Sequence, residues 1–427
     1  MRWLASGTAA LILAGLILAG LILGTACSGS PASNSTATTI DFWYVPSGAQ
    51  PDQYFQDAAK SFHAQHPDIE VKGTKIAPGD AYTKMHSALT GAGAGGPDVM
   101  QVDMSWVGAF AATGAMREFT ADDVQNLGGS TAFVPAAWST SAAFNTGKIT
   151  AIPWFIDTRA IYYRTDILKQ VGIDPADGFK DWEALDHTLE AIRASGKIAP
   201  LGIPGKNDAS VVASFAPWIW EAGGSLMSDD GTRPTINQPA AVDGVDEYQR
   251  FGGKYVDPGV LQRTNTEVES MFAAGKFAVT IAGPSLALKL QGQQFGVQQF
   301  PNGHAGHVVY LGGSDLAIRK SSPRATQAYE WVRWLVSSAG QTTYVKKTGM
   351  YPALVAAAPE GAFKSQMSLG RTFPTLAAWP ALEKVMATNL ANIWNGVASG
   401  KQPMPKDALE TILKNTATDM QTALDQP

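Results

Sequence analysis

The sequence has little cysteine and little charge. Only one of its 427 residues is a cysteine, Cys27, so no disulfide can form within the chain and a zinc cluster of cysteines is excluded. Charged residues make up 16% of the chain, and 32 basic against 37 acidic residues give a net charge of −5. No basic excess therefore points to nucleic acid as a partner. The hydrophobic content of 45% is ample for a large core and rules out a disordered chain.

The common catalytic motifs are also missing. The P-loop pattern, G-x-S-x-G and H-E-x-x-H do not occur. Gly91, Gly93 and Gly96 match G-x-G-x-x-G, but they follow a predicted helix and precede a predicted strand, so we interpret them as a turn rather than a dinucleotide site. We interpret both histidine pairs as solvated side chains: His63 with His66, and His304 with His307. The sequence thus predicts no cofactor and no metal.

The first 39 residues differ in composition from the rest. Residues 1–26 carry one charge, at Arg2, and a long apolar run that ends at Cys27. The ending Gly24–Gly29 (GTACSG) resembles a bacterial lipobox, in which the cysteine becomes the new N-terminus and carries lipid; Gly24 stands where a Leu is usual. We expect a signal peptide over 1–26, a flexible tether over 27–39 and lipid anchoring at the extracellular face of the cell membrane. A retained anchor helix is the alternative.

The body of the chain alternates strand and helix patterns. The first half predicts strands at 40–45, 69–76 and 99–102, and helices at 52–65, 81–89 and 106–112. The second half predicts helices at 182–194, 242–255, 267–274, 325–337, 381–398 and 408–424, with short strands at 160–163, 277–281 and 315–318. This alternation is typical of an α/β fold with helices layered on sheets.

Aromatic and charged residues gather in four segments that we expect near strand ends. Ligands of α/β sheets bind at the carboxyl ends of strands. Flat aromatic rings suit the apolar faces of sugars, and carboxylate or guanidinium groups suit their hydroxyls. Together the four segments predict a cleft for a polyol. Their candidate residues are Asp103, Ser105, Trp106, Trp154, Asp157, Arg159, Trp218, Trp220, Glu221, Arg371 and Trp379.

From Ile40 to the C-terminal helix, the sequence resembles the extracellular solute-binding proteins of carbohydrate ABC transporters, a group that includes maltose- and trehalose-binding proteins. The matching stretches are IDFWYV, GGPDVMQVDMSWVGAFAATGAM, GKITAIPWFIDTRAIYYRTDIL, FAAGKFAVTIAGPS, YLGGSDLAI, AYEWVRWLVSS and GQTTYVKKTGMYPAL. The resemblance implies the two-lobed, type II periplasmic-binding-protein fold. Its three crossovers would lie near 155–159, 276–281 and 311–318. The N-lobe would be 40–156 with 282–312, and the C-lobe 160–275 with 319–427.

The same resemblance implies a monomer that binds a carbohydrate, hands it to the permease subunits of an ABC transporter and catalyses no reaction. Family binding positions fall on the residues of the four segments and on Gly313 and Ser314 in the third crossover. Ser285 stands where the maltose-binding pattern has a Trp, which disfavours maltodextrin. The loop from Asp103 to Trp106 resembles the trehalose-type branch of the family, so the resemblance implies a disaccharide such as trehalose or a related glucoside.

Two alternatives stay open. A secreted glycoside hydrolase would need two carboxylates about 5–10 Å apart, which Asp157 and Glu221 could supply. A solute-binding protein of the same fold could instead take a peptide, a polyamine or a metal, although segments rich in aromatic residues disfavour a metal.

Overall fold

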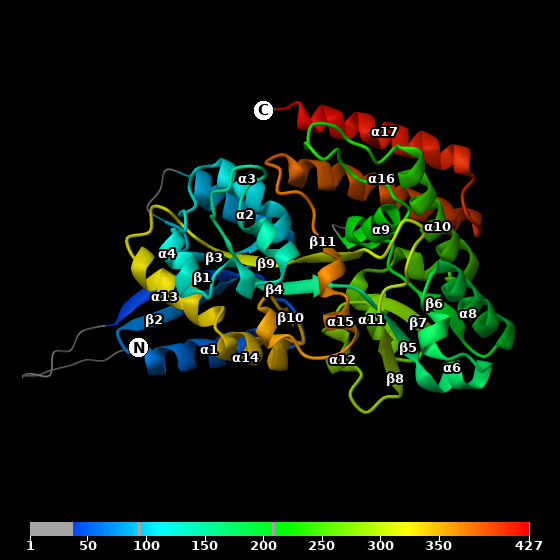
Figure 1. The fold of residues 1–427 in the computed structure, drawn as a ribbon, viewed down its shortest axis with the longest axis horizontal. Helices are drawn as coiled ribbons and strands as arrows, with labels where there is room; N and C mark the ends of the chain where they lie inside the picture. Colours follow the sequence, from blue (N-terminus) through cyan, green and yellow to red (C-terminus); the bar gives the residue numbers. More distant parts are fainter. Residues whose placement is uncertain (1–36, 92–94, 207–209, 427) are drawn as a thin grey trace, which may run out of the picture. The chain divides into compact units, whose positions relative to one another are not determined.

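Two β-sheets, each covered by helices, build the described part of the chain (Figure 1). The computed structural model describes residues 37–91, 95–206 and 210–426. The predicted signal peptide, most of the tether and Cys27 lie outside these residues. Across the described ranges, no helix combines the length and the apolar composition needed to cross a membrane.

The first sheet runs in the order β10-β4-β9-β3-β1-β2, with the short β11 paired to β9. Neighbours β1, β2 and β3 are parallel, whereas β9 is antiparallel to β3 and β4. Alternate residues of β1 face α1, α13 and α14, and the other face of the sheet packs on α2 and α3. The strands are β1 Thr38–Tyr44, β2 Ile69–Lys75, β3 Val99–Asp103, β4 Ile152–Thr158, β9 Val309–Ile318, β10 Tyr351–Pro352 and β11 Gly370–Arg371. The helices are α1 Pro51–Gln65, α2 Pro78–Thr90, α3 Val107–Ala112, α13 Ala325–Leu335 and α14 Ser338–Thr348.

The second sheet has the order β6-β7-β5-β8 and lies within the largest hydrophobic core. Its strands are β5 Ala160–Arg164, β6 Ala199–Gly202, β7 Phe277–Ala282 and β8 Phe295–Gln298. Its main helices are α6 Thr165–Val171, α8 Trp182–Ser195, α9 Ser210–Glu221, α10 Pro239–Tyr255, α11 Asn265–Ala273, α16 Trp379–Gly400 and α17 Lys406–Leu424. Short elements complete the described chain: α4 Ala121–Asn126, α5 Pro135–Trp138, α7 Pro175–Gly178, α12 Leu286–Lys289 and α15 Ala362–Ser365, with 3₁₀ turns η1 Met104–Trp106, η2 Ser130–Ala132, η3 Ser139–Ser141, η4 Val260–Gln262, η5 Val355–Ala357 and η6 Met367–Leu369.

The chain passes between the two sheets three times. It leaves β4 and enters β5 across Arg159, returns from β8 to β9 through 299–308, and crosses again between β10 and α16. One buried amide joins all three passages. Gln366 donates from Nε2 to the carbonyl oxygen of Arg159 (2.7 Å), and its Oε1 accepts from the backbone N–H of Phe300 (3.0 Å).

The predicted crossovers near 276–281 and 311–318 fall on β7 and β9, which lie within the two sheets, whereas the chain passes between the sheets through 299–308 and between β10 and α16. Two segments also pack with a different sheet from the one that the predicted lobes imply. The resemblance implies that residues 282–312 belong to the N-lobe, but β8 pairs with β5 in the second sheet. Residues 319–427 were assigned with the second sheet, but α13 and α14 pack on α1 and β1 of the first. An amphipathic helix shows in its sequence which face it buries, but not which sheet it buries that face against.

Most predicted elements of the body are present within a few residues of their expected ends. β1 begins at Thr38, so the last two residues of the predicted tether already belong to the sheet. The helix α9 was not predicted; ten of its twelve residues are buried, so its sequence is apolar on nearly every side.

Candidate functional site

A polar cavity of about 380 Å³ lies where the two sheets meet. We call it the central cavity. Its lining comes from the loop after β1, from residues of β3, β4 and β9, and from α11 and α12. Its lining residues are Pro46, Ser47, Gly48, Asp103, Phe155, Asp157, Arg159, Asn265, Thr266, Glu269, Gly283, Ser285, Lys289, Tyr310, Gly313, Ser314 and Met350. Five predicted site residues therefore come together here: Asp103, Asp157, Arg159, Gly313 and Ser314.

Two of the cavity's three carboxylates are paired with cations. Arg159 Nη1 lies 2.6 Å from Asp157 Oδ1, and Lys289 Nζ lies 2.6 Å from Glu269 Oε2. Asp103 has no cation within ion-pair distance among the described residues. Its Oδ1 instead accepts from the backbone N–H of Ser105 (2.9 Å) and from the Ser105 hydroxyl (2.8 Å). A second oxygen of Asp103 is left to accept hydrogen bonds from a ligand.

A second acid lies behind Asp103. The Ser105 hydroxyl is also 3.4 Å from Oε2 of Glu383, which α16 brings across from the second sheet. Burial, with a smaller contribution from the nearby Asp103 carboxylate, raises the pKa of Glu383 to about 8, and the bond from Ser105 opposes this shift. The pKa of Asp103 is raised too, chiefly by burial, and its bonds from Ser105 oppose that shift. Ser105 thus does not line the cavity but holds Asp103 in place through two hydrogen bonds. Glu383 was not among the residues predicted from the sequence.

A second pocket, of about 280 Å³, holds two more predicted residues; we call it the arginine pocket. The Arg371 guanidinium lies over the Trp220 ring, 4.8 Å from its centroid, and donates to the Ser225 hydroxyl (3.0 Å). Arg371 is positioned by β11, where it pairs with Tyr310 of β9. The ring of Tyr310, which lines the central cavity, lies 5.2 Å from that of Phe373, which lines the arginine pocket. The two cavities are therefore neighbours across one pair of rings.

Three predicted tryptophans belong to the hydrophobic cores and line neither cavity. Trp154 packs among Phe42, Tyr54 and Tyr344 under the first sheet. Trp218 is 0% exposed and stacks on Tyr248. Trp379 is equally buried at the start of α16. We therefore correct their selection as site residues. Large aromatic rings that stabilise the core occur in the same sequence patterns as rings that line a cleft, so the sequence does not separate the two.

Glu221 is also corrected from a ligand residue to a buried structural one. It is 0% exposed at the end of α9, and accepts from Trp182 Nε1 (3.0 Å) and from the backbone N–H of Val308 (3.0 Å). Burial raises its pKa to about 9 despite these two bonds. Since Glu221 lines neither cavity while Asp157 lines the central one, the carboxylate pair considered for a hydrolase does not form.

Trp106 lies between these outcomes. It is half-buried, with its ring against Tyr82 (5.6 Å between centroids) and Phe110 (6.1 Å), and it lines neither cavity.

Several cavity residues were not predicted from the sequence, among them Ser47, Asn265, Glu269, Lys289 and Tyr310. Of these, Ser47 follows a predicted strand and could have been found by the strand-end argument. The residues of α11 and α12 carried no such signal.

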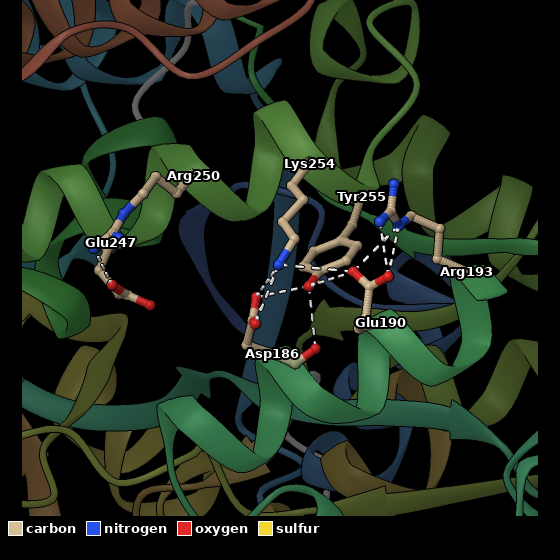
Figure 2. A network of polar contacts seen from close by, with 7 residues as sticks. All are labelled: Asp186, Glu190, Arg193, Glu247, Arg250, Lys254 and Tyr255. Atoms are coloured by element: carbon tan, nitrogen blue, oxygen red, sulfur yellow. Dashed lines mark hydrogen bonds and ion pairs between the residues drawn. The ribbon is translucent and has the colours of Figure 1, made fainter.

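A further cavity, between α8 and α10, is lined in part by a polar network that joins the two helices (Figure 2). Lys254 Nζ lies 3.2 Å from Asp186 Oδ2 and 3.7 Å from Glu190 Oε2, and the Tyr255 hydroxyl donates to Asp186 Oδ1 (2.7 Å). Glu190 also pairs with Arg193 of its own helix (2.7 Å). Because its acids and bases satisfy one another on one sheet's helices, we interpret this network as structural.

No group of three or more His, Cys, Asp or Glu side chains able to hold a metal ion occurs within 37–91, 95–206 and 210–426. The residues of the two cavities offer hydrogen-bond acceptors, the three cations Arg159, Lys289 and Arg371, and aromatic rings. These groups can form hydrogen bonds and ring contacts with a polar organic molecule.

The fold and the site define a two-lobed α/β binding protein like the maltose-binding proteins. The chain belongs to the family of bacterial extracellular solute-binding proteins, whose sequence profile matches residues 46–342. The family consists of binding proteins, in agreement with the prediction that the chain is not an enzyme.

Similar proteins and structures agree with this assignment. A probable ABC transporter-binding protein of Deinococcus radiodurans is 27% identical over 64% of this chain and 66% of its own length. The diacetylchitobiose-binding protein DasA of Streptomyces coelicolor is 25% identical over 86% of both chains. A solute-binding protein of Thermotoga lettingae solved with α-D-tagatose has a TM-score of 0.77 at 21% identity, covering 91% of this chain and 100% of that one. At 21% sequence identity, this last match is evidence for the fold alone.

Proposed function

We propose that the protein binds a carbohydrate between its two sheets and delivers it to an ABC importer. The observation that carries the proposal is the pair of neighbouring cavities, which combine acceptors and cations around Asp103 and Asp157 with the Trp220–Arg371 platform. Their volumes lie near the lower end of the range of about 300–1,000 Å³ typical of small-molecule sites. Relatives whose names specify sugars support the same ligand class.

The two cavities favour a ligand of about two sugar rings. One ring would bind in the central cavity, where Asp103 and Asp157 accept hydrogen bonds from hydroxyls. The other would bind in the arginine pocket, with hydroxyls near Arg371 and Ser225 and a ring face near aromatic side chains. We infer a disaccharide such as trehalose or a related glucoside. Because residues on both sheets contribute, binding would favour a closed arrangement of the two lobes.

We also propose that the mature chain acts as a monomer tethered by lipid on Cys27 to the outer face of the cell membrane. The lone cysteine after small residues supports this anchor, and the family's extracellular description agrees with the compartment. The permease subunits of the importer would be its partners.

A thermal-shift screen tests the ligand class. Residues 37–427 form one compact unit, so the chain from residue 28 can be screened against monosaccharides and disaccharides, with spermidine and a tripeptide for the alternatives. A ligand at 100 times its dissociation constant should raise the free energy of unfolding by about 2.7 kcal/mol. A shift with spermidine or the peptide, and with none of the sugars, would contradict the proposal and favour a non-sugar ligand.

A further inference from the structure

Tyr310, which lines the central cavity, places its hydroxyl over a glycine of its own strand. Tyr310 and Gly312 are two residues apart on β9, so they belong to the same face of the strand. A methyl group on Gly312 would lie 2.0 Å from the Tyr310 hydroxyl oxygen, so the ring extends along the strand and covers this glycine. The hydroxyl therefore occupies the space that a side chain at position 312 would fill.

This position brings the hydroxyl of Tyr310 beside Asp157. In the first sheet β9 lies between β4 and β3, and Asp157 of β4 is paired directly opposite Gly312. Directly opposite residues of an antiparallel pair share a face, with Cβ atoms about 4.5–5.5 Å apart. On the other edge of β9, Asp103 is paired with Ser314. Burial and the carboxylates of Asp103 and Asp157 raise the pKa of Tyr310 well above its ordinary value, so its hydroxyl keeps the proton that it can donate.

The tyrosine is held in place, but its hydroxyl makes no hydrogen bond with the described residues. The backbone carbonyl of Tyr310 accepts from Thr158 Oγ1 (2.6 Å), and its ring packs against that of Phe373 (5.2 Å between centroids). Asp157 uses Oδ1 for Arg159, whereas its Oδ2 also has no partner in the described ranges. A free donor and a free acceptor thus lie side by side among the residues of the central cavity.

We propose that Tyr310 is a specificity-determining residue, whose hydroxyl donates to a ligand hydroxyl that at the same time donates to Asp157 Oδ2. This inference rests on the proposed function and names the group that the central cavity recognises. A sugar hydroxyl has one hydrogen to donate and lone pairs that accept, so it satisfies both side chains together. A deoxy position offers neither and would leave both side chains without a partner. The central cavity should therefore reject sugars that lack this one hydroxyl.

The test compares sugars that differ in one hydroxyl. Calorimetry at neutral pH would measure trehalose, maltose and cellobiose, and then the 2-, 3-, 4- and 6-deoxy forms of those that bind. In the wild type, we expect one ring position at which loss of the hydroxyl weakens binding at least about ten-fold, because a donor and a charged acceptor both lose their partner. In Tyr310→Phe the intact sugar should bind about three- to ten-fold more weakly, and loss of the same hydroxyl should then cost less by that factor.

Two further variants locate the effect. Asp157→Asn should also reduce the cost of losing that hydroxyl, and at the same ring position, because one ligand group binds both side chains. Tyr82→Phe is the matched control: it removes a hydroxyl on α2 that lines neither cavity, so it should give wild-type values throughout. Tyr310→Phe keeps the ring that packs against Phe373, so its melting temperature should stay close to that of the wild type.

The outcomes separate the two proposals. If Tyr310→Phe binds the intact sugar as tightly as the wild type, the role of Tyr310 is refuted and sugar binding stands. If it loses affinity but keeps the wild-type pattern across the deoxy sugars, its effect is structural and the inference is likewise refuted. If Tyr310→Phe and Asp157→Asn change the response at different ring positions, no shared hydroxyl exists. If none of the three disaccharides binds to the wild type, the proposed disaccharide and this inference both fail.

Discussion

The buried Glu221 should make the stability of the protein depend on pH, and replacing it with Gln should remove that dependence. The pKa of Glu221 is raised to about 9 in the folded chain from an ordinary value of 4.5. Burial is the main cause, and the bonds from Trp182 and Val308 oppose it. Below about pH 4.5 the carboxyl is protonated in both the folded and the unfolded chain. As pH rises toward about 9, unfolding releases a proton, so the free energy of unfolding falls.

The magnitude follows from the shift. One pKa unit corresponds to about 1.4 kcal/mol, so between about pH 5 and pH 8 this group alone could lower the free energy of unfolding by at most about 4 kcal/mol. In Glu221→Gln that slope is lost. The amide also replaces one acceptor with a donor, which leaves either the Trp182 or the Val308 N–H unpaired at a cost of about 1–3 kcal/mol at every pH. We therefore expect the wild type to be the more stable at about pH 5, and the difference to shrink or reverse by about pH 8.

Urea unfolding followed by circular dichroism at several pH values measures this difference. Asp122→Asn, on α4, is the control, because an exposed carboxylate should give a curve parallel to that of the wild type. A gap between the wild type and Glu221→Gln that stays constant with pH would mean that Glu221 is ionised in the fold, and would refute the reasoning. Loss of sugar binding in a well-folded Glu221→Gln protein would return this residue to the site.

Three further variants test other parts of the account. Trp218→Ala should lower the free energy of unfolding by about 3–5 kcal/mol and leave sugar affinity unchanged in the folded fraction. A Trp218→Ala variant that melts normally but binds sugar weakly would contradict the place of Trp218 in the core. Arg371→Ala should weaken sugar binding about ten-fold or more in calorimetry with little change in melting, because its guanidinium is exposed; normal affinity would remove the arginine pocket from the site. Cys27→Ala should abolish lipid labelling and release the chain from the membrane fraction, whereas unchanged fractionation would contradict the lipid anchor.

The polar part of the site was predictable because it follows strand ends. Asp103 ends β3 and Asp157 lies near the end of β4, and both strands flank β9, so their ends meet at one edge of the sheet. Trp218 and Glu221 were misplaced because the same reasoning treated a buried helix as a strand end. Glu383 could not have been found. It lies on a long helix whose sequence does not show that one of its turns reaches Ser105 on the other sheet.

The absence of a loose linker in the body also has a structural explanation. The two sheets are joined by three separate passages, and Gln366 bonds to the backbone of the other two, at Arg159 and Phe300. A buried amide with both ends bonded is costly to expose, so the passages must either move together or break these bonds as a set. Opening and closing around a ligand, which the proposed function requires, is therefore a concerted change of all three passages. The first passage is the single residue Arg159, and the third is built of short helices, turns and β11, so neither has the sequence of a flexible linker.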